Sequence, residues 1–188
     1  MVGLFGAMAA AALALAIPAA AAPPEDVPLP ALPAAVETAL AGPYAGWRIP
    51  TLVDREGYDF CARKPAPGAP APAVRHPYIV SGDFDGDGRT DYAAYFMRER
   101  GGRTSHAAAA MLADGRVVRL EGPDDVPDRV PLYFLDVTPK GTTLTSVYSA
   151  KTRRLATDAV DLIRCEAASR SLVYDAKLKR FRAIQTSD

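Results

Sequence analysis

The chain contains the stretch Ser81-Gly-Asp-Phe-Asp-Gly-Asp-Gly-Arg-Thr-Asp-Tyr92, in which aspartates occupy positions one, three, five and nine of a loop that begins at Asp83. Alternate side chains of a curled chain can point toward a common centre, and the intervening glycines permit the curl. Carboxylate and carbonyl oxygens are the ligands that calcium prefers. The stretch therefore predicts a calcium site formed by the side chains of Asp83, Asp85, Asp87 and Asp91 and the backbone carbonyl of Arg89.

One position departs from an EF-hand loop. The twelfth position, where an EF-hand carries a bidentate Glu, is held by Ala94. This alanine lies in Tyr92-Ala-Ala-Tyr-Phe96, a run typical of a strand rather than of an exiting helix. We therefore expect weaker binding than in an EF-hand. The alternative is an Asp/Gly-rich turn without metal, in which four crowded carboxylates would repel one another unless solvent screened them.

The rest of the sequence predicts an α+β domain. Apolar residues at helical spacing predict a helix over 32–40, and Asp54 could cap a second helix that ends near Lys64. Trp47 lies in a predicted short strand over 44–53, where core or edge packing is expected. Eight further runs separated by turns are predicted as strands, namely 91–97, 105–112, 116–120, 131–137, 142–149, 159–164, 171–174 and 181–185. We therefore expect N-terminal helices packed on a curved antiparallel meander, with the calcium loop leading into a strand.

The N-terminal region predicts export. Residues 3–17 form an uncharged apolar run that is too short to span a membrane, and small residues follow it. We assign residues 1–22 to a signal peptide, 23–31 to a proline-rich lead-in and 32–188 to one domain with no membrane span. The expected location is periplasmic or extracellular.

Composition excludes some partners. The chain carries 22 basic and 22 acidic residues, so its formal net charge is zero. That balance argues against nucleic acid and against anionic membrane surfaces. The basic cluster over 151–154 is interpreted as a solvated turn.

Few residues outside the loop predict chemistry. Cys61 and Cys165 are expected to form a disulfide in an oxidising compartment, the alternative being two buried thiols. His76 and His106 are the only histidines, and neither has a neighbouring partner that predicts catalysis. The pairs Asp124–Asp125 and Asp158–Asp161 are typical of turns, although carboxylates of a glycosidase-like pair meet in space rather than in sequence.

The chain resembles small secreted bacterial proteins of uncharacterised function that bear a single FG-GAP/VCBS-like (EF-hand-like) calcium loop. The resemblance lies in residues 79–93, in 32–36 with 44–48, and in 158–163 with 171–174 and 181–187. It implies calcium binding and no particular activity.

Together these observations predict a secreted or periplasmic calcium-binding domain in which Ca2+ is structural. We expect a non-enzymatic role toward an envelope or extracellular protein or glycan. The alternatives are an envelope hydrolase that uses an acidic pair and a small inhibitor of a hydrolase.

Overall fold

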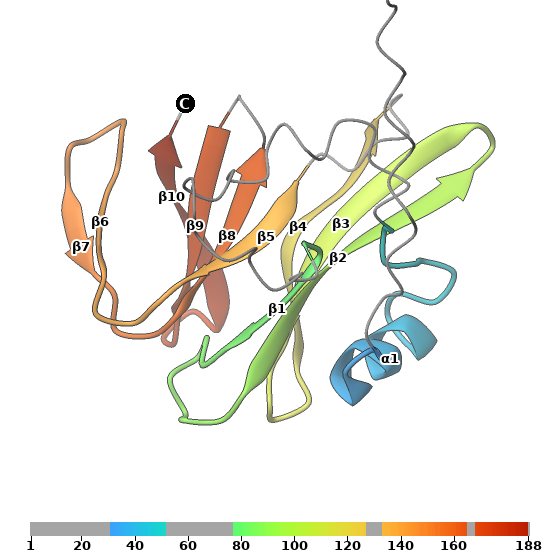
Figure 1. Cartoon of the computed structure of the whole chain (residues 1–188), viewed down its shortest axis with the longest axis horizontal. Helices are drawn as coiled ribbons and strands as arrows, with labels where there is room; N and C mark the ends of the chain where they lie inside the picture. Colours follow the sequence, from blue (N-terminus) through green and yellow to red (C-terminus); the bar gives the residue numbers. More distant parts are fainter. Residues whose placement is uncertain (1–30, 52–76, 127–132, 165–167, 188) are drawn as a thin grey trace, which may run out of the picture.

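The computed structural model describes residues 31–51, 77–126, 133–164 and 168–187 (Figure 1). All strand pairs between them are antiparallel. The elements in chain order are α1 (Ala34–Ala41), β1 (Ile79–Gly82), β2 (Asp91–Arg100), β3 (Arg103–Met111), β4 (Val117–Val126), β5 (Phe134–Thr138), β6 (Thr143–Thr145), β7 (Thr152–Arg154), β8 (Ala159–Arg164), β9 (Ala168–Asp175) and β10 (Arg180–Ser187).

The strands form two four-stranded sheets and a hairpin. The first sheet has the order β1-β2-β3-β4, the second has the order β10-β9-β8-β5, and β6 pairs with β7 in the connection between β5 and β8. The edges of the two sheets lie close together, with β5 beside β1 and β10 beside β4. At the first of these seams the Leu135 N–H donates to the Pro77 carbonyl at 2.7 Å.

Strand β2 is central because both of its faces are covered. On one face the ring of Tyr95 lies 6.3 Å from that of Tyr133, which directly precedes β5 of the second sheet. On the other face Phe96 stacks on Tyr44 with ring centroids 4.2 Å apart. Helix α1 packs near this outer face and buries Val36 and Ala39. The core of the molecule therefore lies between the two sheets, with a smaller layer under α1.

The antiparallel arrangement is confirmed, whereas the α+β class is wrong. The fold is mostly β, because the described residues contain one helix of eight residues, which is too short to cover a sheet about 20 Å wide. A second sheet covers the first instead, so the expected single meander is divided in two. The second predicted helix, the signal peptide and residues 23–30 of the lead-in lie outside the described residues.

The Trp47 segment also differs from its prediction. Arg48 makes an isolated bridge with Met97, and no strand forms over 44–51. Trp47 packs edge-on against Tyr44 with centroids 5.9 Å apart, and the Arg98 guanidinium lies 4.6 Å from its ring centroid. The expected packing role of this tryptophan agrees with these contacts.

Candidate metal centre

The aspartate loop connects two paired strands. It runs from Asp83 to Thr90, and its ends are held together because Gly82 of β1 lies opposite Asp91 of β2. Gly86 and Gly88 adopt φ values of +86° and +81°, which side chains other than glycine rarely adopt. These two glycines allow the chain to curl within a hairpin.

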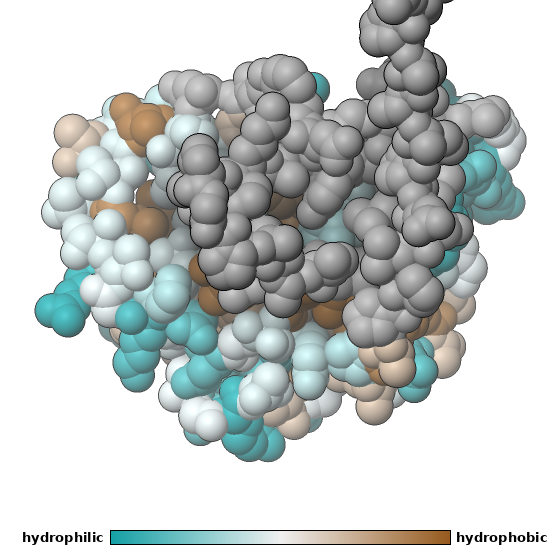
Figure 2. All heavy atoms as spheres, in the orientation of Figure 1, coloured by the Kyte–Doolittle hydropathy of each residue, from teal (hydrophilic) through white to brown (hydrophobic). Residues whose placement is uncertain are grey.

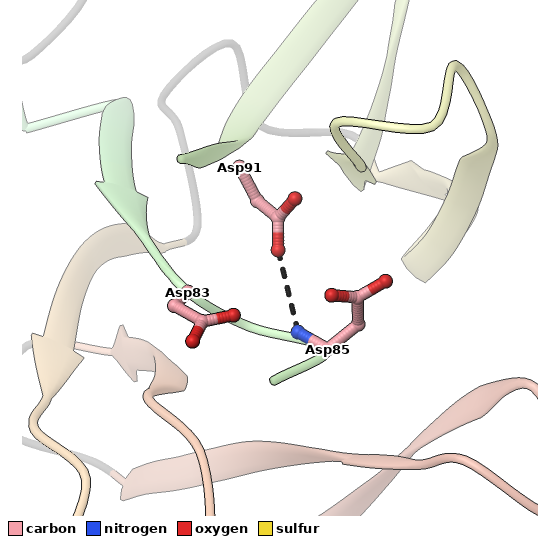
Figure 3. A group of neighbouring side chains, drawn as sticks. All are labelled: Asp83, Asp85 and Asp91. Atoms are coloured by element: carbon pink, nitrogen blue, oxygen red, sulfur yellow. Dashed lines mark hydrogen bonds between the residues drawn. The ribbon is translucent and has the colours of Figure 1, made fainter. Parts of the chain in front are cut away.

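Three carboxylates converge inside the curl. Oxygens of Asp83, Asp85 and Asp91 all lie within 4.8 Å of one another, and this group could hold a metal ion (Figure 3). Asp91 comes from the first position of β2, whereas Asp83 and Asp85 come from the loop itself. The donor set is carboxylate oxygen alone, which suits a hard cation such as calcium or magnesium.

Asp91 is the fixed member of the group. It is fully buried, and its carboxylate accepts backbone N–H bonds from Phe84 at 2.8 Å, Asp85 at 3.3 Å and Ala113 at 2.8 Å. Burial raises the pKa of Asp91 above its usual value, while these three N–H groups act in the opposite direction. A nearby cation favours the ionised form of a carboxyl, so a bound metal would act against the effect of burial on Asp91.

The other two carboxylates shape the loop. Asp83 accepts the N–H groups of Gly86 at 2.8 Å and Gly88 at 3.2 Å, so it closes the turn around its own side chain. Asp85 accepts the N–H of Asp87 at 3.2 Å. The local bonds thus place the first two ligands of the predicted set where they meet Asp91.

Asp87 is directed elsewhere. Its carboxylate accepts the backbone N–H of Arg89 at 2.8 Å and pairs with the Arg89 guanidinium at 2.6 Å. These bonds lower the pKa of Asp87. The structure brings together three of the four predicted carboxylates, and ligation by Asp87 and by the Arg89 carbonyl stays a prediction.

Two residues that sequence reasoning did not connect with the loop support the group. Arg116 donates to Asp85 at 3.2 Å and to the Tyr174 hydroxyl at 2.6 Å, and it also pairs with Asp114. Asp158 accepts the N–H of Asp83 at 2.9 Å, and its own N–H donates to the Asp83 carbonyl at 3.1 Å. The only sequence signal for Arg116 is its place after the Asp114-Gly115 turn, and nothing local signals Asp158.

The surroundings of the loop carry excess negative charge. Six carboxylates, those of Asp83, Asp85, Asp87, Asp91, Asp114 and Asp158, lie at the loop with two guanidinium groups, those of Arg89 and Arg116. Four negative charges are left unbalanced in this count. A divalent cation would remove half of that excess.

Asp158 and Asp161, one of the two acidic pairs considered from sequence, are each engaged with other groups. The second carboxylate oxygen of Asp158 accepts the Lys140 N–H at 2.8 Å, so both its oxygens hold backbone. Asp161 lies opposite Asp136 in register and accepts the Thr138 hydroxyl at 2.6 Å. Burial raises the pKa of Asp161, and the charge of Asp136 adds to the effect.

The other candidate residues lie partly inside and partly outside the described part of the chain. Asp124 and Asp125 lie in β4, opposite His106 and Ser105 in register, and His106 is 2% exposed inside the core. The positions of His76 and of the predicted disulfide cysteines, Cys61 and Cys165, lie outside the described residues.

Comparisons of the chain with protein-family models, with curated proteins and with solved structures gave no match. Among the described residues, no helix has the length and apolar character needed to cross a bilayer.

Proposed function

We propose that this chain is a secreted or periplasmic binding domain whose aspartate loop holds a structural Ca2+. The observation that carries the proposal is the convergence of Asp83, Asp85 and Asp91 at the point where β2 enters the core. Calcium takes six to eight oxygen ligands, so three carboxylates would supply part of the shell. Asp87 would join them by leaving Arg89, together with the Arg89 carbonyl and water.

The metal would act on the fold. Asp91 is the first residue of β2, and Phe84 next to the ligands is fully buried in the core between the sheets. A cation bridging Asp83 and Asp91 would therefore fix both ends of the loop that joins β1 to β2. Binding to the folded state alone adds about 2.7 kcal/mol of stability at a hundredfold excess of calcium over Kd.

A binding role is favoured over catalysis because the carboxylates nearest the loop are already engaged in holding it. Asp158 uses both oxygens on backbone N–H groups, and Asp83 does the same within the loop. The export expectation rests on the apolar run over residues 3–17. Its test is the intact mass of the protein recovered from the envelope or the medium, which should correspond to a chain that begins near residue 23.

The metal is tested by thermal unfolding with calcium and with chelator. For a domain of this size, 2.7 kcal/mol corresponds to a rise in Tm of about 5–10 °C. The double variant Asp83→Asn/Asp85→Asn should lose this rise. Asp114→Asn is the matched control, because it removes a neighbouring exposed carboxylate that is not a member of the converging group.

Calcium titration by calorimetry measures binding at the same site without unfolding the protein. One calcium per chain in the wild type and in Asp114→Asn, with no binding in the double variant, is the expected result. Magnesium should bind more weakly, because it dehydrates reluctantly and demands near-ideal octahedral geometry. If chelator and calcium give the same Tm and no heat of binding is detected, the loop is a self-bonded turn and the proposal fails.

A further inference from the structure

The hairpin of β6 and β7 exposes apolar side chains at its turn. Val147 is 46% exposed and Tyr148 is 76% exposed, and the two are adjacent in sequence. The hairpin lies at the periphery of the molecule, and hydrophobic atoms are visible at the upper left of the surface, over this turn (Figures 1 and 2). Two neighbouring apolar side chains at a protruding turn are a feature that a contact could use.

The turn is held in place. Leu144 of β6 packs against the buried Leu155 and Ala159, which anchors the hairpin on the second sheet. Within the turn the Ser146 N–H donates to the Lys151 carbonyl at 3.0 Å, and the Val147 N–H donates to the Gln185 carbonyl of β10 at 3.1 Å. The exposed side chains are therefore presented from an ordered base.

Cations follow the apolar pair, beginning three residues after Tyr148. Lys151, Arg153 and Arg154 are exposed, and residues 142–155 contain no Asp or Glu. None of the three cations makes an ion pair with another residue in the described part of the chain. The chain as a whole has no net charge, but this segment carries a local charge of +3.

We propose that residues 146–154, the hairpin tip, dock on an anionic phospholipid surface. Tyr148 and Val147 would enter the headgroup region, where an amphipathic ring finds both apolar and polar surroundings. Arg153 and Arg154 point to opposite faces of β7, so the cations on the face turned to the membrane would lie near lipid phosphates, each strengthening binding about fivefold. A soluble polyanion would match the cations but would leave the apolar pair in water, so a membrane surface fits both features.

The tip can be read with a local reporter. The only tryptophan of the chain is Trp47, so Tyr148→Trp in a Trp47→Phe background places the single indole at the tip. The full chain is mixed with vesicles of phosphatidylglycerol and phosphatidylcholine, or of phosphatidylcholine alone. We expect a blue shift of emission and quenching by brominated lipid with the anionic vesicles only. The apolar N-terminal run is common to all variants, so a difference between variants cannot come from it.

Charge variants locate the contact. Lys151→Gln/Arg153→Gln should weaken binding to anionic vesicles about 25-fold. The matched control is Lys177→Gln/Lys179→Gln in the β9–β10 turn, where the half-exposed Leu178 lies between the two lysines. This turn precedes β10, whereas the hairpin tip contacts β10 near its other end, at Gln185. These substitutions are at exposed positions, so the fold should be retained.

Binding that is lost in the hairpin variant and kept in the control supports the proposal. The proposal is overturned if the indole emission is the same with both vesicle types. It is also overturned if both charge variants weaken binding equally, or if soluble polyglutamate shifts the emission and anionic vesicles do not, because an acidic protein would then be the better partner.

Discussion

Replacing Phe84 by alanine should destabilise the fold by about 3–5 kcal/mol. Phe84 lies between two of the converging aspartates, yet its side chain is fully buried in the core between the sheets. A phenylalanine buries about 150–200 Å² of surface, which at 25 cal/mol per Å² is worth about 4–5 kcal/mol. This agrees with the range for truncating a buried phenylalanine, in which the residual cavity adds to the lost transfer energy.

The assay is equilibrium unfolding in urea followed by Trp47 fluorescence, in chelator so that metal binding does not contribute. The midpoint should fall while the m value stays unchanged. Phe181→Ala is the matched control, because Phe181 is only partly buried and its loss should cost clearly less. A loss below about 1 kcal/mol for Phe84→Ala, or an equal loss for both variants, would refute the idea that the loop is anchored through this ring.

Three further outcomes are expected. Gly86→Ala should lower Tm more than Gly88→Ala, because both residues have positive φ but only at Gly86 would the new Cβ lie 2.8 Å from the Thr157 methyl group; equal losses would contradict this. Arg116→Gln should enlarge the calcium-dependent rise in Tm, because it removes a cation that competes for the loop carboxylates, and an unchanged rise would show that the guanidinium does not compete. Asp161→Asn should become more stable relative to the wild type as pH rises. The raised pKa of Asp161 gives the wild type a stabilisation that is fully present below the ordinary carboxyl value of 3.8 and is lost as pH rises through the folded value; paired urea curves that keep a constant difference between low and neutral pH would refute this.

Those residues of the candidate site that lie close together in the sequence could be predicted from it. Asp83, Asp85 and Asp91 fall within nine residues, and alternation with glycine is enough to predict that their side chains converge. The orientation of Asp87 was not predicted, because its carboxylate forms an ion pair with the guanidinium of Arg89, two residues later, instead of pointing toward the other aspartates. Support from Asp158, 75 residues from Asp83, depends on how the second sheet meets the first.

The positions of most strands could be predicted from the sequence, whereas their division into two sheets could not. Alternating runs located most of the strands, whereas β1 and β7, of four and three residues, are too short to give a periodic signal. Apolar alternation says that one face of a strand is covered, but it does not say by what. The neighbouring Ala94 and Tyr95 of β2 are both buried because α1 and its following segment cover one side and the second sheet covers the other.

The seam between β1 and β5 has a consequence for the order of folding during synthesis. All pairings of the first sheet lie within residues 79–126, and all those of the second lie within residues 134–187. The first sheet is a meander of neighbouring segments, so it can assemble before the second sheet has formed. Strands β1 and β4 are the edges of the first sheet, and until β5 and β10 arrive beside them these edges lack their neighbours from the second sheet. The nascent chain is therefore most vulnerable to wrong pairing during the interval in which residues 127–187 are being made.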